Sequence, residues 1–346
     1  MNRRGIWALA GAAAGVGAGL VAQHSVINRR RRNDPEGGQR FGTRRGERSR
    51  LLELEDGARI FVEETGPMSS RGAVFVHGSC MRTDMWHYQL PGIGGHRLIF
   101  YDLRGHGMSR PKGDAEFSIQ RLVEDLRTVI EDSDLDEVVI VGHSVGGMIA
   151  LDLCRLYPDD LGGRIKGLVL LNTTHRPAVE TIIGGAPLAR VERAIRRPLD
   201  ALGARSDYVE YLRRVIKPSD TVFMAVSLAA FGPGASAKQI DFTYDMLAET
   251  PAEVIFDLIR SYRDYEVTEH LGGVNVPTLV IGGTHDRITI GRASEEIAER
   301  LPKAELKVLE GCGHMSMLER HREVNRSLEA FFDDVLGNPE EQGERG

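Results

Sequence analysis

The sequence predicts an α/β protein in which a mostly parallel β-sheet carries helices on both faces. Short apolar runs alternate with segments of helical apolar spacing over residues 51–336. One run, residues 138–141, leads directly into Gly-x-Ser-x-Gly at residues 142–146, and a helical pattern starts at once. Residues 174–272 interrupt the alternation and show no strand pattern. We therefore expect a helical cap inserted between two core strands.

The composition excludes several classes of protein. The chain has 346 residues, 41% hydrophobic and 27% charged, and a net charge of −6, which gives no reason to expect nucleic acid as a partner. Its three cysteines, Cys80, Cys154 and Cys312, cannot all pair and lack metal-site spacing. We expect reduced thiols, no metal site and no cofactor.

The N-terminal segment, residues 6–27, is apolar and lies between two groups of arginines. It is long enough for a transmembrane helix, which needs roughly 20 residues. A signal peptide is the alternative, but no convincing cleavage site precedes the arginines at 29–32. We predict an anchor helix over residues 1–28, with the folded domain that follows in the cytoplasm, because more arginines follow the segment than precede it. Export through a cleaved or uncleaved signal is the alternative location.

Small residues recur in this anchor, since Gly11, Gly15 and Gly19 fall at every fourth position. Such spacing lets membrane helices associate, although a low-complexity tract would look the same. Residues 29–50 are rich in arginine and poor in apolar side chains, so we expect a basic flexible linker close to anionic lipid. Residues 337–346 are expected to form a disordered tail.

The core elements follow one another in the order expected for a parallel sheet. The predicted strands are residues 51–54, 59–63, 73–76, 98–101, 138–141, 167–171, 277–281 and 306–309. The predicted helices are residues 117–130, 146–157, 292–301 and 323–336 in the core, and 209–216, 221–230 and 252–262 in the cap.

The Gly-x-Ser-x-Gly stretch has the sequence context of a nucleophile elbow. A buried strand fixes the position of Ser144, and a sharp strand-to-helix turn exposes its hydroxyl. Gly142 and Gly146 leave room for this turn. The following helix directs its positive N-terminal end toward any anion that forms there.

A base and an acid follow Ser144 in the chain order that such a site requires. Asp286 comes shortly after the strand at 277–281, and His314 after the strand at 306–309. Carboxyl ends of parallel strands meet at one edge of a sheet, so both side chains should lie near Ser144. No carboxylate directly follows the strand at 167–171. We expect His314 to act as the base and Asp286 to orient it. The alternatives are that His314 is only a hydrogen-bonded loop histidine and that Asp286 only caps the following helix.

The remaining polar groups near these loops have more than one interpretation. The backbone amides of Val145 and Ser79 are the expected oxyanion donors, with Cys80 as the alternative to Ser79. His143 is expected to pack beside the elbow. A further group, His77, Asp102, Arg104 and His106, suggests a metal or acid–base cluster, but a hydrogen-bonded structural corner is favoured.

Together these motifs resemble the α/β-hydrolase superfamily, and in particular its capped serine esterases and lipases. The resemblance covers residues 51–336 and rests on His77-Gly78, the segment 101–107, the elbow at 142–147, Gly283-Thr284-His285-Asp286 and Gly313-His314. It implies cleavage of a carboxylic ester, which a membrane anchor suggests is lipophilic, through an acyl-enzyme. Serine at the elbow argues against the haloalkane dehalogenase and epoxide hydrolase mechanism, which needs a carboxylate nucleophile.

The same triad also serves other reactions, so the substrate stays open. A thioesterase, a carbon–carbon bond hydrolase and a cofactor-free perhydrolase are alternatives of the same class. A ligand-binding or sensor protein that keeps the fold without turnover, or a membrane scaffold, is the alternative of another class.

Overall fold

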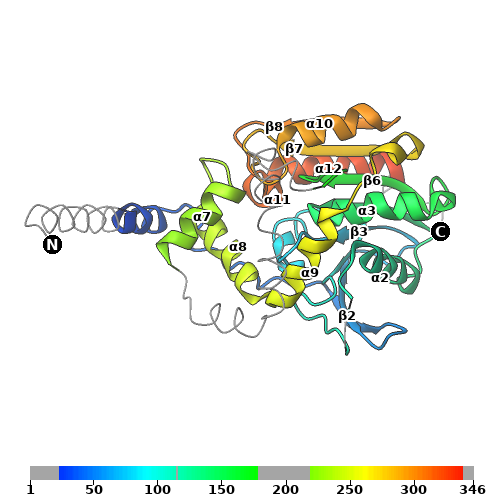
Figure 1. The fold of residues 1–346 in the computed structure, drawn as a ribbon, viewed down its shortest axis with the longest axis horizontal. Coiled ribbons are helices and arrows are strands. Elements are labelled where there is room, and N and C mark those ends of the chain that lie inside the picture. Colours follow the sequence, from blue (N-terminus) through cyan, green and yellow to red (C-terminus); the bar gives the residue numbers. More distant parts are fainter. Residues whose placement is uncertain (1–22, 114–115, 178–218, 338–346) are drawn as a thin grey trace, which may run out of the picture.

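An eight-stranded sheet forms the centre of the protein, in the strand order β1-β2-β4-β3-β5-β6-β7-β8 (Figure 1). The computed structural model describes residues 23–113, 116–177 and 219–337. Strands β1 and β2 are antiparallel additions, and the other neighbours pair in parallel. The strands are β1 (Arg48–Glu53), β2 (Arg59–Thr65), β3 (Arg71–Val76), β4 (Arg97–Tyr101), β5 (Glu137–His143), β6 (Ile165–Leu171), β7 (Thr278–Gly283) and β8 (Ala304–Leu309). The predicted fold class is confirmed.

Helices cover both faces of the sheet, which explains why its central strands are apolar throughout. Side chains of β5 alternate between two cores: Val138 and Ile140 pack with α2, α3 and α10, whereas Val139 and Val141 pack with α12. The core helices are α2 (Ile119–Asp132), α3 (Val145–Leu156), α10 (Gly291–Arg300), α11 (Ser316–Glu319) and α12 (His321–Leu336), and the 3-10 turns are η1 (Thr83–Trp86), η2 (Pro158–Asp160) and η3 (Thr268–Gly273).

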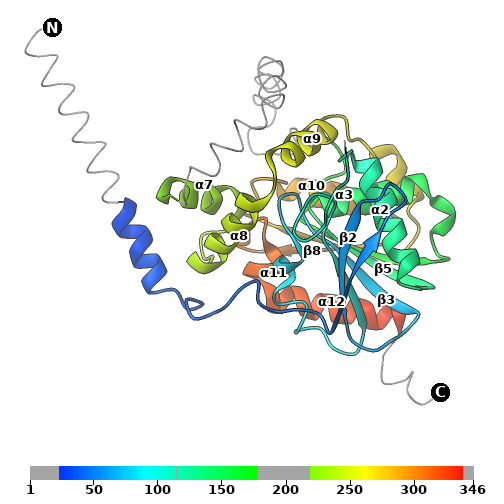
Figure 2. The same ribbon diagram turned by 90° about the horizontal axis from the view of Figure 1, so that it is seen from below.

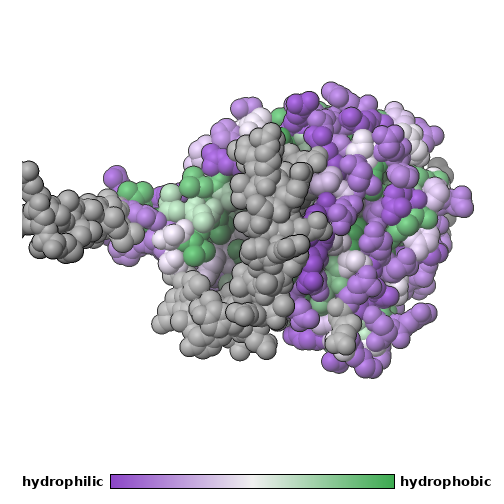
Figure 3. All heavy atoms as spheres, in the orientation of Figure 1, coloured by the Kyte–Doolittle hydropathy of each residue, from purple (hydrophilic) through white to green (hydrophobic). Residues whose placement is uncertain are grey.

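The predicted helical cap is present between β6 and β7. It consists of α7 (Asp220–Ala230), α8 (Ala237–Glu249) and α9 (Ala252–Arg263), of which α8 was not separately expected. The helix predicted at 209–216 lies outside the described residues. Phe223 and Ile240 belong to the core on the α12 side, while α7 also exposes apolar surface (Figure 3), with Leu228 53% exposed.

The basic segment before β1 is packed rather than flexible, which corrects the linker predicted over residues 29–50. Residues 23–32 are helical and lie beside the cap (Figures 1 and 2). Arg31 donates two hydrogen bonds to Asp241 of α8, at 2.9 and 2.7 Å. Asp34 accepts from the Ser236 hydroxyl and the Lys238 amide at the start of α8. The charged side chains from which a flexible linker was predicted therefore attach this segment to α8.

The expectation of a membrane-anchored protein is wrong for the residues that the structure describes. Within residues 23–113, 116–177 and 219–337, no helix combines the length and apolar character that a bilayer span requires. Ile27, the last residue of the expected span, is fully buried in the core that includes the cap. The predicted helix over 1–28 is not confirmed, because residues 1–22, with Gly11, Gly15 and Gly19, lie outside the described residues. The expected tail beyond Gly337 does too.

Candidate active site

Ser144 occupies a strained turn between β5 and α3. Its φ of 53° and ψ of −117° lie in a region that side-chain-bearing residues rarely adopt. The neighbouring glycines are required, because a Cβ at Gly142 would lie 2.4 Å from the Gly146 carbonyl oxygen. A Cβ at Gly146 would lie 2.1 Å from that of Val76. The sequence pattern therefore corresponds to a true elbow.

His314 and Asp286 form a buried pair on the loops that follow the adjacent strands β8 and β7. The distance from His314 Nδ1 to Asp286 Oδ2 is 2.9 Å, and the two residues are 4% and 3% exposed. The other carboxylate oxygen, Oδ1, accepts from the amides of Ile288 and Thr289 at 2.9 and 2.8 Å. Burial by itself would raise the pKa of Asp286, but the charge of His314 and the donated hydrogen bonds lower it below its ordinary value.

Two further side chains bind this carboxylate, and neither was predicted from the sequence to have a role. Asn172, directly after β6, donates through Nδ2 to Asp286 Oδ2 at 2.9 Å and to the Gly313 carbonyl at 3.2 Å. The Thr289 hydroxyl donates to the same Oδ2 at 2.8 Å. The position of Asn172 at the end of a central parallel strand was the available signal. Asn172 holds the acid loop and the histidine loop together.

His143 connects the elbow to the histidine loop. Its Nε2 lies 3.0 Å from the carbonyl oxygen of His314, and the two rings have centroids 4.7 Å apart. Complete burial lowers the pKa of His143 to about 3, so the ring is neutral and Nε2–H donates. This agrees with the packing role expected for His143. The contact joins the residue before Ser144 to His314, whose Nδ1 alone is hydrogen-bonded among the described residues.

The loop after β3 passes close to Ser144. A Cβ at Gly78 would lie 3.3 Å from the Ser144 Cβ. The Cys80 amide is already used, since it donates to His106 Nε2 at 3.1 Å. The Ser79 amide has no acceptor within the described residues, and the Val145 amide opens α3, where a helix leaves its first N–H groups without an internal partner. This arrangement favours Ser79 over Cys80 as the companion of Val145.

The polar residues that follow β3 and β4 form a structural corner, as favoured from the sequence. Burial lowers the pKa of His106 to about 4, so that ring is neutral. No group of three or more His, Cys, Asp or Glu side chains is placed to hold a metal in the described part of the chain. Each polar side chain here has a protein partner: His77 accepts from the Leu103 amide, Asp102 from the Thr83 and Met108 amides, and Arg104 donates twice to Asp125.

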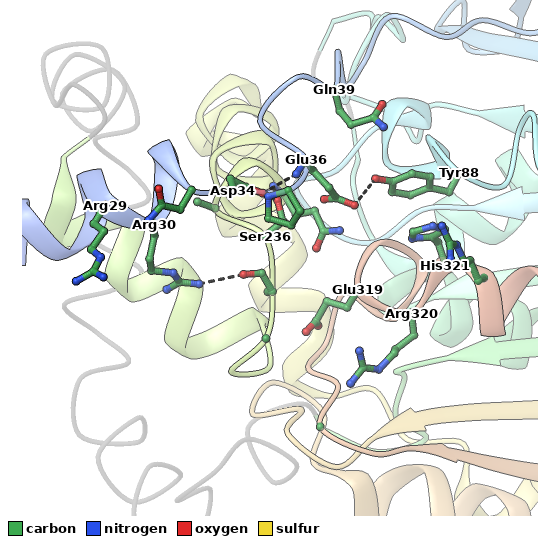
Figure 4. Close-up of a pocket in the computed structure, with 18 of the residues that line it drawn as sticks. Arg29, Arg30, Asp34, Glu36, Gln39, Tyr88, Ser236, Glu319, Arg320 and His321 are labelled. Carbon is green, nitrogen blue, oxygen red and sulfur yellow. Dashed lines mark hydrogen bonds between the residues drawn. The ribbon is translucent and has the colours of Figure 1, made fainter.

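A cavity of about 860 Å³ lies elsewhere, between the N-terminal segment, the start of α8 and the start of α12 (Figure 4). Its lining includes Arg30, Glu36, Tyr88 and His321, and none of the three candidate catalytic residues. The Tyr88 hydroxyl donates to Glu36 at 2.7 Å, and its ring stacks on His321 with centroids 3.8 Å apart. These contacts make the cavity part of the joint between segment, cap and core.

A serine elbow beside a histidine–aspartate pair, on a parallel sheet with an inserted cap, defines a hydrolase-type α/β enzyme. The chain belongs to the alpha/beta hydrolase family, whose model matches residues 73–327. The family assignment made from the motifs is thus confirmed, and the protein is an α/β-hydrolase enzyme.

Relatives of this chain carry several different activities in their names. It is 29% identical over 295 residues to a non-heme chloroperoxidase, CPO-A1, of Kitasatospora aureofaciens, with 82% of this chain and 99% of the relative covered. It is 28% identical over 279 residues to a putative carbamate hydrolase, RutD, of Variovorax paradoxus, with 80% and 97% covered. An esterase structure from Exiguobacterium antarcticum matches with a TM-score of 0.63 at 20% identity, covering 82% of this chain and 99% of the esterase. The last comparison supports the fold.

Proposed function

We propose that the protein cleaves carboxylic esters through an acyl-enzyme on Ser144, with His314 as the base and Asp286 as the orienting acid. The observation that supports this most strongly is the buried 2.9 Å contact between His314 and Asp286 on the loop next to the Ser144 elbow. A hydroxyl is a weak nucleophile without such a base.

The contacts suggest a role for each group in the reaction. His314 Nε2 takes the proton as the Ser144 oxygen attacks the ester carbonyl, and the Ser79 and Val145 amides bind the oxyanion. His314 then gives the proton to the departing alcohol. Water repeats the sequence on the acyl-enzyme and releases the acid. Asp286 remains ionised throughout, because its pKa is held below the ordinary value, and it stabilises the imidazolium.

The preference for a lipophilic ester loses its support together with the membrane anchor. A short-chain p-nitrophenyl ester is therefore the appropriate first substrate. Ser144→Ala should lower kcat by about 10⁶-fold without loss of folding, as removal of a nucleophilic serine does in other hydrolases. Ser327→Ala, a hydroxyl on α12 that binds Lys307, is the control and should keep full activity. Activity of Ser144→Ala close to that of the wild type would reject the mechanism.

A second candidate, the cofactor-free perhydrolase, is favoured by relatives named non-heme chloroperoxidases. Hydrogen peroxide would then replace water in attacking the acyl-enzyme, which gives a peracid and free Ser144. Adding peroxide during ester turnover and measuring peracid through halide oxidation separates the two reactions. Release of free acid alone at millimolar peroxide would exclude the second candidate.

A further inference from the structure

A tyrosine of the cap has a buried hydroxyl without a hydrogen-bond partner. Tyr262 lies near the end of α9, and within the described residues its hydroxyl oxygen neither donates nor accepts. Buried polar groups are nearly always satisfied in folded proteins, so such an exception requires an explanation. One explanation is that the hydroxyl forms its hydrogen bond only with a bound substrate.

The surroundings of this hydroxyl are those of the candidate oxyanion site. Two residues of the loop after β3 act on the pKa of Tyr262: Ser79 lowers it through its side chain, and the charge of Cys80 raises it. The Ser79 hydroxyl is near enough for weak hydrogen bonding that lowers the pKa of Tyr262, but the pair does not reach full hydrogen-bond geometry, and the Ser79 hydroxyl also lies 3.5 Å from Cys80 Sγ. Burial raises the pKa of Tyr262, so its hydroxyl keeps its proton at neutral pH and remains a donor.

The end of α9 is fixed on both sides of Tyr262. The Ser261 hydroxyl accepts from the Ile119 amide at the start of α2, at 2.8 Å. The Tyr265 hydroxyl donates to the Met148 carbonyl in α3, the helix that begins after Ser144, at 3.0 Å. Helix α9 also packs against α2. These contacts fix the end of α9 on α2 and α3, so Tyr262 and its hydroxyl occupy a fixed position.

Among the described residues, the hydroxyls of the other tyrosines differ in whether they have a hydrogen-bond partner. The hydroxyls of Tyr88, Tyr157 and Tyr265 each have an acceptor. Tyr101 in β4 shares the unpartnered, buried state, but its hydroxyl lies in the core on the α2 side, where Asp125 acts on it. Tyr101 therefore provides a matched comparison.

We propose that the Tyr262 hydroxyl is a third oxyanion donor, which binds the ester carbonyl oxygen together with the Ser79 and Val145 amides. The proposal rests on the proposed function, since an oxyanion forms only if Ser144 attacks. The hydroxyl gains its hydrogen bond as negative charge develops on the carbonyl oxygen. The free energy lost by burying it in the free enzyme is then recovered in the transition state, where it accelerates the reaction.

Tyr262→Phe tests the proposal with a single atom removed. Its kcat on a short-chain p-nitrophenyl ester should fall about 100-fold, the usual effect of deleting one oxyanion donor, while KM changes less than about threefold. Its melting temperature should stay the same or rise, because no hydrogen bond is lost. The melting temperature of Tyr101→Phe should likewise stay the same or rise, but its kcat should remain within about twofold of the wild-type value.

The outcomes separate this proposal from the proposed function. If the wild-type enzyme turns over ester and its Ser144 reacts with a fluorophosphonate, but Tyr262→Phe keeps wild-type kcat, the Tyr262 donor is rejected and the triad stands. A rise in KM at constant kcat would also reject it, since that pattern indicates ground-state binding. A lower melting temperature with unchanged kcat would show a purely structural hydroxyl. If wild-type Ser144 fails to react and no ester is cleaved, both proposals fall.

Discussion

Two clusters of buried histidine and aspartate follow two separate pairs of adjacent strands, β3 with β4 and β7 with β8, and their hydrogen bonds differ. In the pair after β7 and β8, His314 uses only Nδ1, for Asp286, among the described residues. In the corner after β3 and β4, His77 and His106 each bind the backbone through both ring nitrogens. A ring with both nitrogens occupied has no position for a proton from a substrate.

The aspartates of the two clusters, Asp102 and Asp286, differ in the direction of their pKa shifts. Burial raises the pKa of Asp102 to about 6, even though it accepts two backbone amides. Asp286 is buried to a similar degree, yet its pKa is lowered because His314, Asn172 and Thr289 bind it. Residue type and burial alone do not distinguish an active site from a structural corner. The hydrogen-bond partners do.

Asp286→Asn should produce the largest change predicted from this comparison. The amide would remove the charge that stabilises the His314 imidazolium and would favour the wrong tautomer, so kcat should fall about 10⁴-fold. Ester turnover measured on protein whose melting curve matches the wild type is the check. A loss of less than tenfold would mean that Asp286 does not orient the base.

Asp125→Asn, in the structural corner, should lower the free energy of unfolding and leave catalysis unchanged. It breaks the buried, doubly hydrogen-bonded pair with Arg104, whose side chains are 0% and 1% exposed. Breaking such a pair costs about 3 kcal/mol. Urea unfolding should show this loss, while kcat per folded molecule stays within about twofold. A large fall in kcat would assign the corner a catalytic part.

The smallest predicted effect is a pH-dependent change in stability at Glu319, which connects the cap to the loop that carries His314. Its carboxylate accepts from the Gly313 and Gly232 amides at 2.9 and 2.8 Å. Burial raises its pKa from 4.5 to about 7, so between these values the folded protein holds a proton that the unfolded chain releases. This contribution lowers stability as pH rises through that window.

Glu319→Gln removes the titration. Its melting temperature, relative to that of the wild type, should therefore increase from pH 4.5 to pH 7. Parallel melting curves for the two proteins across this window would show that Glu319 does not titrate there.

The positions of the three candidate residues after adjacent or nearby strands were predictable, because parallel strands end at one edge of a sheet. Ser144, Asp286 and His314 each follow a strand whose apolar run is plain in the sequence. Asn172 and Tyr262 were not predicted, because each acts on residues far away in the chain. Asn172 binds Asp286, which lies 114 residues later, and Tyr262 of the cap acts near Ser79 in the loop after β3. Chain order carries no direct signal of such contacts.

The N-terminal segment shows why composition misled. Its arginines and few apolar residues predicted a flexible linker, but acidic groups at α7 and α8 bind them, as in the pair of Arg31 with Asp241. Ile27 was assigned to a membrane and is buried in protein instead. Hydropathy measures how strongly a segment avoids water, and it does not identify the apolar surface that covers it.

The most direct test of the central claim is reaction of the whole protein with a fluorophosphonate, followed by peptide mass mapping. We expect a single modified serine, Ser144, with the reaction lost in Ser144→Ala and strongly slowed in Asp286→Asn. An unmodified Ser144 in folded wild-type protein, or equal reaction rates in wild type and Asp286→Asn, would contradict it.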